Sequence, residues 1–141
     1  MKLTAELYYL TLVALLTAAM WIPYILAGIV LREPMRAMAN PVPEVAGQTS
    51  EAAPPAWMQR AKRAHANAVE NLAVFAPLVL IAALAGISTP ATVFAAKLYL
   101  IARIVHYVVY VAGIPVVRTL AFLVGFGATV SIATAILGHA V

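Results

Sequence analysis

Four long, mainly apolar runs constrain the fold of this chain more than any other feature of its sequence. The first, Leu7 to Leu31, has 25 residues without a formal charge. At about 1.5 Å per residue, a helix of that length crosses the roughly 30 Å hydrocarbon core of a bilayer. The other runs are residues 64–85, 91–112 and 116–137. With 65% hydrophobic and 10% charged residues, the composition excludes an ordinary soluble enzyme and a disordered chain. The sequence predicts an all-α integral membrane protein.

The first run also resembles a secretory signal peptide, because Lys2 precedes it. The apolar core of a signal peptide is typically about 7–15 residues long, and this run is much longer and is followed by Arg32 and Arg36. We therefore expect a mature span. Pro23 should kink it, and a neighbouring helix should supply a donor for the carbonyl that the proline leaves free.

The segment between the first two spans, residues 33–56, contains five of the nine prolines. A connection of this length and composition predicts a loop. We expect the second helix to run from Trp57 to Ala85. Tight turns at 86–90 and 113–115 should then make the later helices antiparallel neighbours, so that the whole chain forms one up-down four-helix bundle.

Basic residues flank the long loop, whereas the turn at 86–90 has none. Because cytoplasmic loops carry an excess of Lys and Arg, we expect residues 32–60 to face the cytoplasm and both termini to lie outside. In a bacterial cell this membrane would be the inner membrane. The net charge of +4 includes no dense basic tract, so we expect no nucleic-acid partner. The flanking basic residues are Arg32, Arg36, Arg60, Lys62 and Arg63.

Several polar residues lie inside or beside the spans, where an ionisable group costs about 2.5–3.5 kcal/mol at mid-helix. On the second helix, four of these residues follow the spacing i, i+3, i+7, i+10, which places them on one helical stripe. One further polar residue lies on each side of this stripe. Membrane-surface charge is the alternative explanation for Arg60 and Lys62. The stripe is Arg60, Arg63, Asn67 and Glu70, and its neighbours are His65 and Asn71.

The third helix has a second polar stripe, formed by Arg103, His106 and Tyr110. Arg118 and Thr119 begin the fourth helix on the side of the long loop. Two structural explanations stay open: an ion pair between Glu70 and Arg103, and an interfacial anchoring role for Arg118.

Together these residues supply several cations, one carboxylate and several amide or hydroxyl groups. They predict a pocket for a net anionic small molecule that carries an amine, because arginine pairs with carboxylates and a glutamate accepts from ammonium. Glutathione fits this description, although the residues alone do not single it out. The chain has no cysteine, so any sulfur chemistry needs an external thiol, and no metal site is expected.

Two segments carry a resemblance to a known family. RAKRAHANAVEN, from Arg60 to Asn71, resembles the signature of the MAPEG family, the membrane-associated proteins in eicosanoid and glutathione metabolism. RIVHYVVY, from Arg103 to Tyr110, followed by PVVRT, which ends at Thr119, resembles that family's second signature. The resemblance covers nearly the whole chain, and the bacterial members are the most similar.

The resemblance implies a homotrimer of four-helix bundles with glutathione between neighbouring subunits, toward the cytoplasmic side. By matching position, Arg63, Asn67 and Glu70 would hold the peptide, with His65 close by. Asn71 stands where some members have a tyrosine that contacts glutathione.

From the third helix, Arg103, His106 and Tyr110 would line the site. Arg118 would lie beside the sulfur and favour the thiolate, which is the nucleophilic form, and Thr119 would be a second donor. Arg32 matches an arginine that some relatives place near the acceptor substrate.

The resemblance thus implies a membrane-bound, glutathione-dependent transferase or peroxidase that acts on lipophilic electrophiles or hydroperoxides from the bilayer. One alternative is a non-catalytic scaffold of the same family that binds lipid or glutathione. Another is a small transporter or channel subunit, which predicts a polar stripe through the outer half of the spans; apart from Lys97, the sequence shows none.

Overall fold

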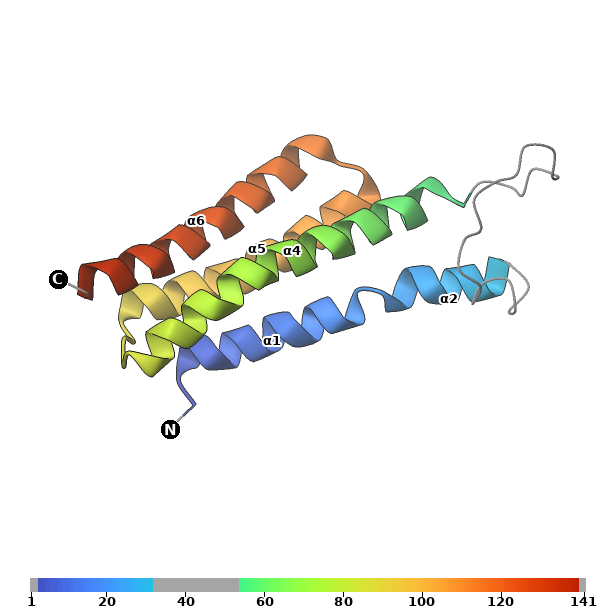
Figure 1. Ribbon diagram of the computed structural model, residues 1–141. Coiled ribbons are helices and arrows are strands. Elements are labelled where there is room, and N and C mark those ends of the chain that lie inside the picture. Colours follow the sequence, from blue (N-terminus) through green and yellow to red (C-terminus); the bar gives the residue numbers. More distant parts are fainter. Residues whose placement is uncertain (1–2, 32–53, 140–141) are drawn as a thin grey trace, which may run out of the picture.

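The computed structural model describes residues 3–31 and 54–139, which form α-helices and turns and no strand (Figure 1). Four helical rods lie side by side, and each is long and apolar enough to cross a membrane. The first rod is divided in two. The expected all-α, four-helix membrane bundle is therefore confirmed. In chain order the helices are α1 (Ala5–Ala19), α2 (Ile22–Leu31), α4 (Ala56–Leu84), α5 (Pro90–Ala112) and α6 (Pro115–His139).

The first rod is interrupted between α1 and α2. Pro23 has no backbone N–H to donate to the preceding turn, and α1 ends at Ala19. At this break the Tyr107 hydroxyl of α5 donates to the Met20 carbonyl at 3.0 Å. A neighbouring helix thus supplies a donor to the Met20 carbonyl. The carbonyl that Pro23 leaves free is that of Ala19, four residues earlier, and a partner for that group stays a prediction.

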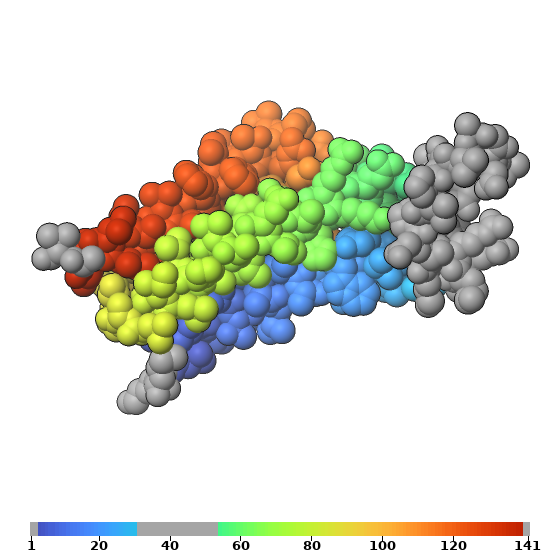
Figure 2. Space-filling model, in the orientation of Figure 1, coloured from blue at the N-terminus to red at the C-terminus, as the bar shows by residue number. Residues whose placement is uncertain are grey.

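The apolar core lies toward the end of the bundle where α1 begins and α6 ends (Figure 1). There the rings of Phe75 and Tyr99 stack with their centroids 3.6 Å apart. Small side chains let the helices approach closely, and Figure 2 shows α4 lying against α1 on one side and α6 on the other. The buried residues of α4, α5 and α6 include the alanines Ala64, Ala68, Ala82, Ala95, Ala96 and Ala128.

A polar cluster at the same end joins α1 to the beginning of α5. The carboxylate of Glu6 is 2% exposed. It accepts a hydrogen bond from the Thr92 hydroxyl at 2.6 Å and from the Ser88 hydroxyl at 3.0 Å. Thr92 also forms a capping box with Thr89 at the start of α5, so the cluster fixes both the helix end and the position of α1.

Candidate functional site

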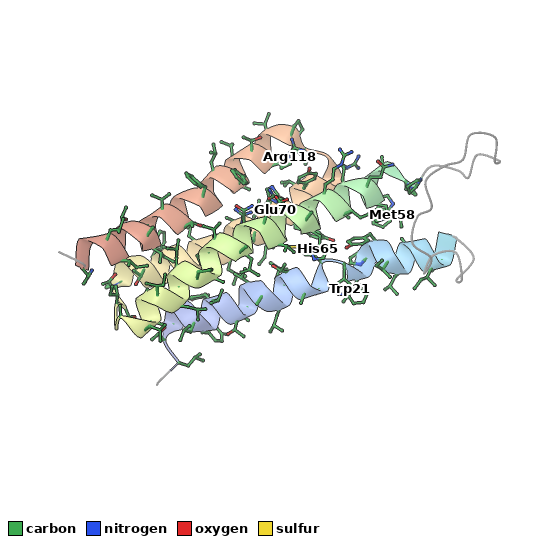
Figure 3. All side chains as sticks on the ribbon, in the orientation of Figure 1. Trp21, Met58, His65, Glu70 and Arg118 are labelled. Atoms are coloured by element: carbon green, nitrogen blue, oxygen red, sulfur yellow. The ribbon has the colours of Figure 1, made fainter. Side chains whose placement is uncertain are left out.

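A cavity of about 230 Å³ lies between α4, α5 and α6, toward the α5–α6 turn. It is far from the Glu6 cluster, near the end of the bundle to which the 32–53 segment connects. In Figure 3, Arg118 and Glu70 lie on the α6 side of α4, whereas His65 lies on the α1–α2 side. The cavity is lined by Asn67, His106, Tyr110, Arg118, Thr119 and Phe122.

The α5–α6 turn brings the lining residues together. Gly113 ends α5 with φ +82°, a left-handed conformation that glycine adopts without steric cost. Pro115 then begins α6. The reversal places the guanidinium carbon of Arg118 4.6 Å from the centre of the Tyr110 ring.

Aromatic contacts continue from Tyr110 into the bundle. Its ring meets His106 edge-on, with centroids 5.4 Å apart and an interplanar angle of 72°. His106 is 4% exposed and lies 6.4 Å from Phe122. No hydrogen bond joins the His106 ring to another residue of the described ranges, so its nitrogens can serve a ligand in the cavity. Sequence reasoning missed Phe122, although its spacing of four residues from Arg118 puts both on one helical face.

Arg103 lies close to Phe122, but it is not one of the residues that line the cavity. Its guanidinium carbon is 4.9 Å from the centre of the Tyr99 ring and 5.7 Å from that of Phe122. The side chain is 2% exposed, and none of its nitrogens has a hydrogen-bond partner among the described residues.

The ion pair between Glu70 and Arg103 is therefore wrong for the described subunit. Long side chains of a helix point toward its N-terminus, and Arg103 accordingly extends toward Tyr99, one turn earlier on α5. Glu70 is exposed on α4, whereas Arg103 is 2% exposed and its nitrogens have no partner among the described residues.

The polar residues of the α4 stripe and their neighbours lie in different surroundings. Asn67 lines the cavity, and its buried Oδ1 has no hydrogen-bond partner among the described residues. The Asn71 amide donates to the Asn67 carbonyl at 2.7 Å. His65 turns away from the cavity, and its Nδ1 lies 2.8 Å from the hydroxyl of Tyr24 on α2. Arg63 is exposed.

Three further residues that the sequence assigns to the site remain to be placed. Arg60 Nε donates to the Val111 carbonyl at 2.8 Å, so this side chain caps the end of α5 beside Gly113. Thr119 lines the cavity and donates to the Pro115 carbonyl at 3.1 Å. Arg32 lies outside the described residues.

The chemistry of the cavity is that of an anion site. Its lining residues supply a guanidinium, an imidazole, a side-chain amide and hydroxyl groups, and no carboxylate is among them. Within residues 3–31 and 54–139, no three His, Cys, Asp or Glu side chains gather in a way that could hold a metal ion.

Comparisons with known proteins agree with this architecture. The model of the MAPEG family matches residues 7–138. Microsomal glutathione S-transferase 1 from Bos taurus, Homo sapiens and Rattus norvegicus is 35% identical over 77 residues, which are 54% of this chain and 50% of each relative. The match thus spans about half the length of these curated relatives. The family match, over nearly the whole chain, shows that this integral membrane protein belongs to the MAPEG family.

Proposed function

We propose that this protein binds glutathione and activates its thiol in the cavity between α4, α5 and α6. The observation that carries the proposal is the Arg118 guanidinium, which lines the cavity while its N–H groups make no hydrogen bond within the described ranges. The proteins that match this chain over half their length are named glutathione S-transferases. The reaction is the transfer of the glutathionyl group to a lipophilic electrophile, or the reduction of a lipophilic hydroperoxide.

Arg118 favours the thiolate because a guanidinium beside a thiol stabilises the anion and lowers the thiol pKa. The partly desolvated cavity strengthens this interaction relative to water. Each unit by which the thiol pKa falls corresponds to about 1.36 kcal/mol between its two protonation states. Thr119 adds a hydroxyl to the same wall of the cavity.

The rest of the peptide is bound by groups inside the cavity and at its rim. Asn67 and His106 both line this cavity, and their side chains would contact the peptide there. Arg63 and Glu70, exposed on α4, would pair with a carboxylate and with the ammonium group. Arg103, which lies close to Phe122, contributes a positive charge without touching the peptide.

The two reactions use the same nucleophile. In transfer, the thiolate sulfur forms a bond to an electrophilic carbon, and the leaving group departs with its electron pair. In peroxide reduction, the sulfur attacks an oxygen, the O–O bond breaks, and the alkoxide takes a proton. A second glutathione then reduces the sulfenic acid, which gives a disulfide and water. Lipophilic acceptors would enter from the bilayer, near Arg32 in the family pattern.

Substitution of Arg118 tests the proposal. Arg118→Ala should raise the pKa of the bound thiol and slow the thiol chemistry more than it weakens glutathione binding. Arg118→Lys keeps the charge but loses the planar fork, so its effect should be intermediate. The measurement is the ultraviolet absorbance of the thiolate against pH, with binding measured by calorimetry in parallel.

Two outcomes would contradict the role of Arg118. An unchanged thiol pKa in a well-folded Arg118→Ala protein would remove the residue from the mechanism and favour a non-catalytic, lipid- or glutathione-binding scaffold. Full rescue by Lys, with loss of membrane insertion in the Ala variant, would show an interfacial anchor.

We further propose that the protein assembles as a homotrimer and that a neighbouring copy covers the exposed rim of the site. Native mass spectrometry in detergent tests this directly, and a stable monomer that binds glutathione with full affinity would contradict it. We also propose that residues 32–60 face the cytoplasm and that the termini lie outside. Because the chain has no cysteine, single cysteines introduced at Ser88 and within 32–60 would report the side by their labelling in intact cells.

A further inference from the structure

The guanidinium of Arg118 is held by an aromatic ring. Its central carbon lies 4.6 Å from the centroid of Tyr110, well inside the distance of about 6 Å at which a cation is attracted to a ring face. Neither a carboxylate nor a carbonyl of the described residues accepts a hydrogen bond from this side chain. In the described subunit, the Tyr110 ring is therefore available to orient the guanidinium.

This arrangement suits a site that must stabilise an anion. A carboxylate partner would fix the arginine equally well, but it would neutralise the charge and occupy the N–H groups. A ring face leaves both the charge and the donors available. The stack uses the face of the phenol ring and does not involve its hydroxyl.

Tyr110 is itself well supported. The edge contact with His106, which is 4% exposed, restricts its ring from one side. The last turn of α5 is fixed by the hydrogen bond from Arg60 to Val111 and by the left-handed Gly113. The ring therefore offers a preformed surface on which a side chain from the next helix can rest.

We propose that Tyr110 is a positioning residue, whose ring aims the Arg118 guanidinium at the thiol. This inference rests on the proposed function for its catalytic consequence, but the stacking itself can be tested without glutathione. It differs from a role in which the Tyr110 hydroxyl binds the ligand, because the two roles predict opposite results for removal of the hydroxyl alone.

The first measurement is made on the ligand-free protein in detergent micelles. NMR of the arginine Nε–H groups, assigned with Arg118→Lys, should show a ring-current shift for Arg118. Tyr110→Phe should keep this shift, whereas Tyr110→Leu should abolish it. Tyr110→Met, which is longer and has no ring, serves as a second ring-free variant if the Leu variant folds poorly. Tyr8→Leu, at a 51% exposed position on α1, is the matched control and should change nothing.

The second measurement is the pKa of the bound thiol. Tyr110→Phe should leave it unchanged, and Tyr110→Leu should raise it, because the guanidinium is then no longer held beside the sulfur and stabilises the thiolate less. In an Arg118→Ala background, Tyr110→Leu should have no further effect, since it acts through the arginine.

Several results would overturn the inference. Equal damage from Tyr110→Phe and Tyr110→Leu would show that the hydroxyl is the functional group, and a further rise of the thiol pKa in the Arg118→Ala background would show an independent role. An unshifted Arg118 signal in the native protein would refute the stack. If Arg118→Ala alone left the thiol pKa unchanged, the proposed function would fail, and the NMR measurement would still decide whether the ring holds the guanidinium.

Discussion

Gly125 on α6 faces the buried guanidinium of Arg103, and this contact allows a quantitative test of the packing. A β-carbon at Gly125 would overlap Nη2 of Arg103 and lie 3.1 Å from its Cζ. Because Arg103 is 2% exposed and rests on Tyr99 and Phe122, it has little room to retreat. Gly125→Ala should therefore force α5 and α6 apart or displace the guanidinium. Such overpacking costs about 1–3 kcal/mol.

A control on the same helix isolates this cost. Gly127 has no neighbour within 4 Å of the position that a β-carbon would take. Replacing a helical glycine by alanine otherwise gains about 0.5–1 kcal/mol, a gain that both variants share. We expect Gly127→Ala to be slightly more stable than the native protein and Gly125→Ala to be less stable than Gly127→Ala by about 1–3 kcal/mol.

The assay is reversible unfolding in mixed micelles, followed by the fluorescence of the two tryptophans, Trp21 and Trp57. Arg103→Met should remove most of the penalty of Gly125→Ala, so a double-mutant cycle should give a coupling of about 0.5–3 kcal/mol. Equal stability of the Gly125→Ala and Gly127→Ala proteins, or a coupling near zero, would show that the guanidinium does not rest against α6.

Three further variants test separate contacts. Thr92→Val keeps the side-chain shape but removes a donor to the buried Glu6 carboxylate, so unfolding in micelles should show a loss of about 1.5–3 kcal/mol; native stability would contradict the cluster. Tyr107→Phe removes the donor to Met20, which should cost about 0.5–1.5 kcal/mol and speed hydrogen exchange at the α1–α2 break, whereas unchanged exchange there would count against this hydrogen bond. Glu70→Gln should weaken glutathione binding in calorimetric titrations without changing the unfolding free energy, because Glu70 is exposed and is not paired with Arg103; a marked loss of stability would revive the ion pair.

The sequence was sufficient to predict the bundle because the relevant signals are local. Run length predicts a span, a proline such as Pro23 predicts a break, and short turns such as the one at Gly113 predict antiparallel neighbours. Helical spacing also grouped His106 with Tyr110, and both residues line the same cavity as Arg118.

The partners of individual polar side chains were harder to predict, because spacing along one helix gives no rotation relative to the next. His65 and Asn67 are two residues apart and so lie on different faces: one meets Tyr24 on α2, and the other lines the cavity. The role of Glu6 was missed altogether. A carboxylate at the start of a span, on the same side as the hydroxyl-rich turn at 88–92, was the only signal in the sequence that could have revealed it.

The long-range hydrogen bonds of the first rod have a consequence for how the protein is made. Glu6 and its partner Thr92 are 86 residues apart, and Met20 and Tyr107 are 87 apart. A ribosome synthesises the first rod long before α5 exists, so during translation this rod must remain without its two polar partners on α5. Its contact between Tyr24 and His65, 41 residues apart, becomes possible as soon as α4 emerges. The α2 end of the first rod can therefore dock early, while its α1 end waits for α5, which carries the Thr92 hydroxyl that Glu6 needs.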